Sequence, residues 1–97
     1  MEQFEQDLLN NGYELVNNFE YNHNPNKLDF SIFTIYKGKI DNIYVEVSWF
    51  KKTDVNYGPD KYRVQLDDDY HKSIATTFVK SYDEIEKFVK NYIKRNV

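Results

Sequence analysis

Hydrophobic and polar positions alternate along five segments of this chain, and a period of two is typical of β-strands. The segment 28–36 is the most informative, because Phe30 and Ile32 fall on one side of a strand while Phe33 and Ile35 fall on the other. A strand with one solvated side should be polar on that side. We therefore expect cover on both sides of the sheet near this strand. The five predicted strands span residues 13–22, 28–36, 43–50, 61–66 and 73–80.

Two segments, one near each end of the chain, have helical spacing instead. Phe4, Leu8 and Leu9 form an apolar stripe within residues 2–11, and Gly12 is well placed to end that helix. If both helices pack on one side of the sheet, the other side keeps exposed aromatic surface, which often marks a binding site.

The C-terminal helix is predicted by its start and by its apolar face. Ser81 and Glu84 have the spacing of a capping box. We expect the Ser81 hydroxyl to accept a hydrogen bond from the Glu84 amide, while the Glu84 carboxylate reaches back. An apolar face follows at helical spacing and comprises Ile85, Phe88, Val89, Tyr92 and Ile93.

Short polar connections separate the strands and favour an antiparallel meander with both helices on one face. A bulge is expected near Asn17 and Asn18, where the alternation breaks. The fold prediction for residues 1–97 is one α+β domain, a five-stranded, mainly antiparallel sheet flanked by an N-terminal and a C-terminal helix. Turn signals occur at residues 23–26, 37–39, 41–42, 56–60 and 67–69.

Composition narrows the function classes only a little. The chain has 97 residues, no cysteine and a formal charge of −3, which excludes disulfides and cysteine-ligated zinc and disfavours broad electrostatic binding to nucleic acid. No basic start followed by an apolar run is present, and no apolar stretch is long enough to span a membrane, so we expect a cytoplasmic protein. Abundant Asn, Lys, Tyr, Ile and Phe indicate an AT-rich genome, such as that of a low-GC bacterium, its phage or its plasmid.

The run Asp67-Asp68-Asp69, followed by His71, is the one cluster with metal-ligating residue types. Consecutive residues in a strand point to opposite faces, so they cannot all ligate one ion unless they form a turn, and the spacing fits no calcium loop. We interpret the run as a solvated turn and predict no metal and no cofactor. Its acidic edge is a candidate contact for a partner.

Catalytic candidates are weak. His23 and His71, the two histidines, lie in polar, turn-like segments without a recognisable nucleophile partner. The glycines at 12, 38 and 58 are isolated, so no phosphate-binding loop is formed. We therefore predict a protein that is not an enzyme.

Aromatic residues make up 18% of the chain and suit protein interfaces, because a tyrosine ring carries a polar group. A simpler interpretation is that these rings only fill a small core. On the strands 28–36 and 43–50, alternate residues point to opposite sides. If the helices cover the other side, the partner-binding face comprises Phe33, Ile35, Tyr44 and Phe50. We predict a protein-binding module of the inhibitor or accessory type found in phages and mobile elements, with anti-defence or immunity-like action by steric occlusion.

Two alternatives remain open at the level of sequence. The first is a homodimer joined through the open sheet face. The second is a module that stacks single-stranded nucleic acid on Tyr44 and Phe50, with nearby lysines for the phosphates. The acidic balance and the lack of an RNP-like pattern argue against that second alternative.

Overall fold

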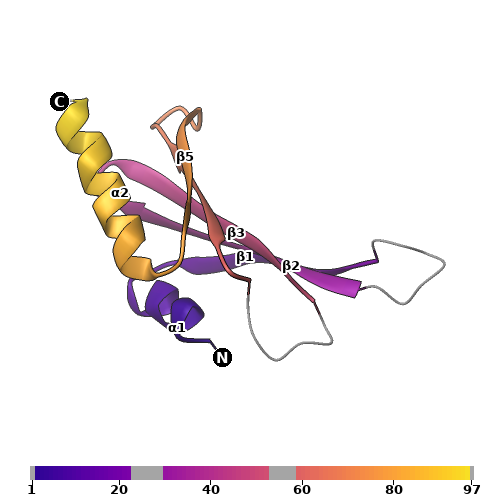
Figure 1. Ribbon diagram of the computed structural model, residues 1–97. Helices are drawn as coiled ribbons and strands as arrows, with labels where there is room; N and C mark the ends of the chain where they lie inside the picture. Colours follow the sequence, from indigo (N-terminus) through magenta and orange to yellow (C-terminus); the bar gives the residue numbers. More distant parts are fainter. Residues whose placement is uncertain (1, 23–29, 53–58, 97) are drawn as a thin grey trace.

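The computed structural model describes residues 2–22, 30–52 and 59–96 of the chain. Within these ranges the elements follow the predicted order of helix, strands and helix (Figure 1). They are α1 (Gln3–Asn10), β1 (Glu14–Asn22), β2 (Phe30–Ile40), β3 (Ile43–Lys52), β4 (Tyr62–Asp67), β5 (Ser73–Val79) and α2 (Tyr82–Arg95).

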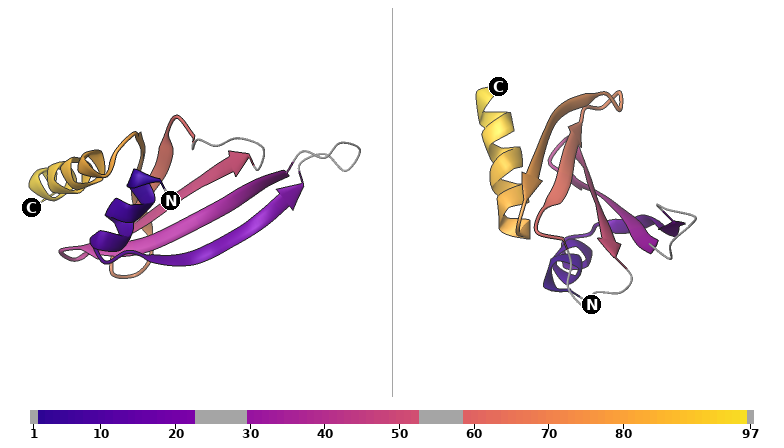
Figure 2. Two further views of the ribbon diagram at one scale, coloured as in Figure 1. Left: turned by 90° about the horizontal axis from the view of Figure 1, so that it is seen from below. Right: turned by 45° about the vertical axis from the view of Figure 1, so that its right-hand side comes forward.

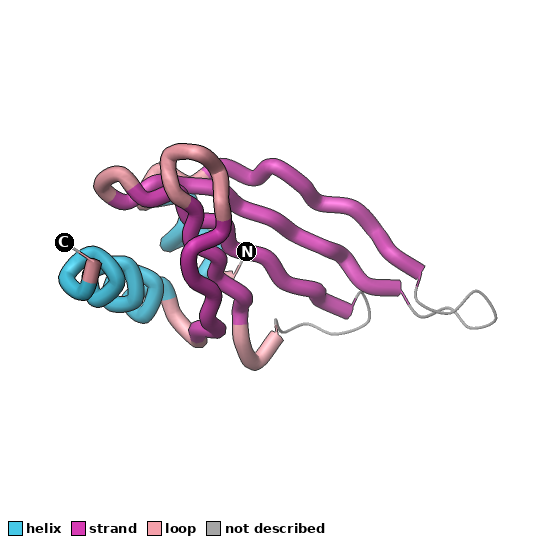
Figure 3. The backbone as a smooth tube through the Cα atoms, turned by 90° about the horizontal axis from the view of Figure 1, so that it is seen from above, coloured by secondary structure: helices cyan, strands magenta, loops and turns pink. Residues whose placement is uncertain are grey.

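The strands form one antiparallel sheet whose spatial order equals the chain order, which confirms the predicted meander. The long strands β1, β2 and β3 extend beyond the helices at one end of the sheet (Figure 3). At the other end, the two residues Asp41 and Asn42 join β2 to β3, and Ile40 pairs with Ile43. Asp41 has a φ of 52°, a positive value of the kind that two-residue hairpin turns need.

The turn predicted at residues 37–39 is wrong, because β2 continues through them to Ile40. Gly38 has a packing role there. A Cβ atom at Gly38 would stand 2.6 Å from the Cγ and Cδ2 atoms of Tyr13, so only glycine lets this ring lie on the strand. The second turn signal, at Asp41 and Asn42, is the correct one.

The predicted bulge in the first strand is present, one residue earlier than expected. The pairing register of β1 with β2 shifts between Leu15 and Asn17, so Val16 is the extra residue. The predicted turn at 23–26, the strand start at Leu28 and Asp29, and most of the turn at 56–60 lie outside the described residues.

Both helices pack on one face of the sheet, as predicted (Figure 2). On β3 the odd-numbered residues Val45, Val47 and Trp49 are buried, and Leu8 of α1 and Ile85 of α2 are fully buried against the same side. The rest of the buried core comprises Phe4, Tyr13, Tyr36, Tyr62, Val64, Leu66, Val79, Tyr82 and Val89.

Helix α1 is held on the sheet by ring stacking and by carboxylates. The Phe4 and Tyr62 rings stack with centroids 3.7 Å apart. Tyr62 Oη donates a hydrogen bond of 3.0 Å to Glu2, and Tyr36 Oη donates one of 3.1 Å to Glu5. Burial, helped by the Glu5 carboxylate, raises the pKa of Tyr36 to about 12. Burial and the hydrogen bond to Glu2 also raise the pKa of Tyr62, so both tyrosines keep their protons, and with them their hydrogen bonds, far into the alkaline range.

Helix α2 starts at the predicted place but not with the predicted cap. Ser81 is the N-cap residue and its side chain makes no capping hydrogen bond. The Glu84 carboxylate instead accepts a hydrogen bond of 2.5 Å from the backbone amide of Lys80, one residue further back than a capping box requires. The predicted apolar face is confirmed, because Ile85 and Val89 are buried and the other members pack against the core.

Candidate interaction face

The sheet face opposite the helices, called the open face below, carries the apolar residues that the sequence suggested for partner binding. Because the odd-numbered residues of β3 pack against the helices, its even-numbered residues Tyr44 and Phe50 point the other way. Phe33 pairs with Phe50, and Ile35 pairs with Ser48. Directly opposed residues of antiparallel strands share a face, so Phe33, Ile35, Tyr44 and Phe50 lie together on the open face. That they bind a partner stays a prediction.

An aromatic row crosses the first three strands of the open face. Phe19 of β1 pairs with Phe33 of β2, which pairs with Phe50 of β3. The first two rings meet edge to face at 5.7 Å between centroids, and the second pair stacks at 4.5 Å. Phe19 is 39% exposed and Phe50 is 47% exposed, so the row presents apolar surface to its surroundings.

A hollow of about 360 Å³ adjoins this row, and a small residue causes it. The next row across the sheet runs Ile35, Ser48, Arg63 and Phe78 by strand pairing. Ser48 lies in the middle of that row, where its short side chain leaves space between much larger neighbours. The residues that line the hollow are Phe33, Ser48, Trp49, Phe50, Lys61, Arg63 and Phe78.

Arg63 at this hollow is oriented by a hydrogen-bonded chain along β4. Its Nη2 donates to Gln65 Oε1 at 2.9 Å, and Gln65 Nε2 donates to Asp67 Oδ1 at 3.0 Å. Among the residues that the structure describes, no carboxylate forms an ion pair with Arg63 or with Lys61. The hollow therefore combines aromatic walls with two cations, and the part of its lining that the structure describes contains no acidic residue.

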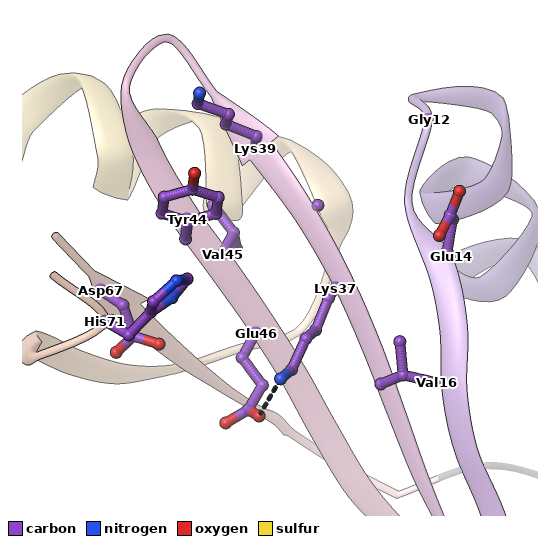
Figure 4. A pocket seen from close by; sticks show the side chains of 11 residues that line it. Gly12, Glu14, Val16, Lys37, Lys39, Tyr44, Val45, Glu46, Asp67 and His71 are labelled. Atoms are coloured by element: carbon purple, nitrogen blue, oxygen red, sulfur yellow. Dashed lines mark ion pairs between the residues drawn. The ribbon is translucent and has the colours of Figure 1, made fainter. Parts of the chain in front are cut away.

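A second hollow, of about 450 Å³, lies on the open face toward the β2–β3 hairpin (Figure 4). The Tyr44 ring lies between the Lys39 ammonium, 5.1 Å from its centroid, and the His71 ring, also 5.1 Å away. Lys37 and Glu46 form an ion pair of 4.0 Å beside them. The charges here are of both signs, so this end of the open face favours no ligand charge.

The acidic run divides between a strand and a turn. Asp67 is the last residue of β4 and points along the open face, where it accepts the hydrogen bond from Gln65. The Asp68 carboxylate accepts hydrogen bonds from the backbone amides of Tyr70 and Lys72 at 2.9 and 3.0 Å. Asp69 is exposed in the same turn. The predicted turn is confirmed for Asp68 and Asp69 but not for Asp67, which belongs to β4, and the use of this run as a partner contact stays a prediction.

Other chemistry has little support in the described ranges. No group of three or more His, Cys, Asp or Glu residues there could hold a metal ion. His71 is exposed at a φ of 61° with its ring against Tyr44, and His23 lies outside the described residues. Neither described helix is long and apolar enough to cross a membrane.

Four residues of the open face were missed as candidates from sequence. Phe19 and Phe78 belong to strands that were predicted, but the rows they form with neighbouring strands could not be drawn without the register, and the bulge at Val16 changes which face Phe19 lies on. Ser48 and Arg63 gain their importance from being opposite each other on β3 and β4. The sequence did contain one signal of the hollow: on β3 the small residue Ser48 stands between larger residues that point to the same side of the strand.

Comparisons with protein-family models, with curated proteins and with solved structures gave no match for this chain.

Proposed function

We propose that this protein is a non-enzymatic protein-binding module that covers a surface of its partner with the open face. The aromatic row Phe19–Phe33–Phe50 carries the proposal, because it is exposed on a sheet face that neither described helix covers. Full burial of a phenylalanine side chain contributes about 1.5–3 kcal/mol, and binding energy is usually concentrated in a few central aromatic and arginine residues. Steric occlusion of this kind suits an inhibitor or accessory protein, such as phages and mobile elements encode.

Charge favours a protein over a nucleic acid as the partner. The open face carries Glu46 and Asp67 among its cations, and the whole chain has a formal charge of −3. Single-stranded nucleic acids need a continuous line of cations for their phosphates in addition to stacking rings. The carboxylates of Glu46 and Asp67 would interrupt such a line of cations and repel the phosphates.

The test is affinity capture with matched variants from an extract of the source cell. We expect the wild type to retain a specific protein that the double variant Phe33→Ser, Phe50→Ser releases. Leu9→Ser is the control, because Leu9 on α1 is an apolar residue whose exposure (43%) is close to that of Phe50 (47%), and it lies away from the open face. Retention by the double variant, or equal loss with Leu9→Ser, would contradict the proposal.

A homodimer through the same face is the alternative, and molar mass distinguishes the two. Light scattering after size exclusion should give the monomer mass of 11.7 kDa across a concentration series. A dimer that Phe50→Ser dissociates would assign the open face to self-association instead.

A further inference from the structure

We infer that the hollow beside the aromatic row binds an acidic apolar segment of a protein partner, a large apolar side chain flanked by carboxylates. This inference rests on the proposed function and specifies its partner. The observation that carries the inference is charge: Lys61 and Arg63 line a hollow with Phe33, Phe50 and Phe78, and none of the described residues that line it is acidic.

The apolar part of the ligand follows from the shape of the hollow. Ser48 provides a short floor that is almost fully buried, at 6% exposure, and phenylalanine rings from three strands stand around it. A volume of about 360 Å³ has room for one large side chain and falls in the range of small ligand sites. An aromatic or branched aliphatic side chain placed there would cover the exposed surfaces of Phe50 and Phe78.

The carboxylate follows from the orientation of Arg63. A guanidinium group carries five N–H donors, and the bond to Gln65 uses one of them. The chain from Arg63 through Gln65 to Asp67 holds the guanidinium along β4, which lowers the entropy cost of a bidentate contact. A partner carboxylate beside the apolar side chain would pair with the Arg63 guanidinium, which forms no ion pair with a carboxylate among the described residues.

A second copy of the chain is a poor occupant of this site. A two-fold axis through the hollow would bring Lys61 and Arg63 against the same two cations of the other copy, and like charges across an interface are costly. A phosphate chain would meet Glu46 one row along the same strands, paired across to Gln65. A short protein segment with one apolar side chain in the hollow can place its carboxylates at Lys61 and Arg63 without extending along the strands to Glu46.

The experiment is a selection of random peptides displayed on phage against the immobilised wild-type protein. Each enriched peptide is then synthesised and its affinity measured for the wild type and for variants. We expect an aromatic or large aliphatic residue flanked by Asp or Glu. We expect Arg63→Gln to weaken binding roughly tenfold or more, as loss of a charge-assisted hydrogen bond does. Lys90→Gln on α2 removes the same charge from an exposed position away from the open face and should change nothing.

Filling the hollow provides an independent check. Ser48→Leu should abolish binding, whereas Ser48→Ala, which leaves the space open, should bind within about twofold of the wild type. Circular dichroism shows whether Ser48→Leu is folded. If it is not folded, the comparison of Arg63→Gln with Lys90→Gln still decides the inference.

Outcomes that contradict this inference can be told apart from outcomes that contradict the proposed function. Enriched peptides without acidic residues, or acidic peptides that bind Arg63→Gln as tightly as the wild type, overturn the inference. If those peptides are still lost in the double variant Phe33→Ser, Phe50→Ser, the proposed function stands. Peptides that tolerate every open-face variant contradict both. No enrichment, or tighter Arg63-dependent binding of a labelled oligothymidylate, also overturns the inference.

Discussion

Replacing Gly38 with alanine should destabilise the protein, although alanine normally improves a strand. The new Cβ would meet three ring atoms of Tyr13 at 2.6–2.8 Å, far inside van der Waals contact. Tyr13 is 2% exposed and its ring meets Tyr82 edge to face at 5.8 Å, so it has little room to move. Overpacking of this kind costs about 1–3 kcal/mol, and the gain of about 0.5–1 kcal/mol from removing a strand glycine offsets only part of it.

The assay is the free energy of unfolding from urea titration, with thermal unfolding as a second readout. A net loss of about 1–2 kcal/mol should lower Tm by roughly 5–15 °C in a domain of this size. The Tyr13→Val, Gly38→Ala double variant tests whether the clash with the Tyr13 ring is the cause, because without the ring the alanine Cβ no longer meets its atoms. Its stability should exceed the value expected from the sum of the two single effects, as coupled neighbours require.

An unchanged or raised stability of Gly38→Ala would refute this reasoning, as would strict additivity in the double variant. Gly12→Ala is the contrasting control. Gly12 has a φ of 83°, and apart from its two chain neighbours nothing lies within 4 Å of the point where a Cβ atom would stand, so the loss of stability should come from backbone conformation.

Three further predictions concern stability. Burial raises the pKa of four core tyrosines (13, 36, 62 and 82) above the value near 10 of the unfolded chain, so their contribution is complete below pH 10 and is lost as the pH rises above it. Urea midpoints should therefore fall above pH 10, and less steeply in Tyr36→Phe. Ile85→Ala should cost about 2–5 kcal/mol because Ile85 is fully buried, whereas Phe78→Ala should stay within about 0.5 kcal/mol at 60% exposure. Glu84→Ala should destabilise α2 by about 0.5–1 kcal/mol and Ser81→Ala by less, because the carboxylate makes the observed capping bond; the opposite order in thermal unfolding would contradict that assignment.

Local patterns in the sequence were sufficient for most of the fold. Alternation on the third strand placed Val45, Val47 and Trp49 on one side and Phe50 on the other, and the structure confirms it. The apolar residues at helical spacing that predict α2 were equally clear in the sequence. Gly38 was misinterpreted because a glycine between two lysines is typical of a turn. A glycine is needed there because the ring of Tyr13, twenty-five positions away in the chain, lies against the strand at this position.

The candidate site was predictable only in part, for a physical reason. Both parities of the second strand are apolar, so the sequence could not decide which one the helices cover. Pairing register, which depends on contacts distant in sequence, brings Ser48 opposite Arg63 and Arg63 opposite Phe78. The hollow exists only in that assembled row, and no single strand predicts it.

Site-specific photo-crosslinking tests the central claim most directly. A photoreactive benzoylphenylalanine replaces Phe78, whose side chain is 60% exposed at the hollow, and in a control it replaces Leu9 on α1. After irradiation in an extract of the source cell, we expect a covalent adduct with another protein from position 78 and none from position 9. Equal adducts from both positions, or none from position 78, would contradict the assignment of the open face as the partner-binding surface.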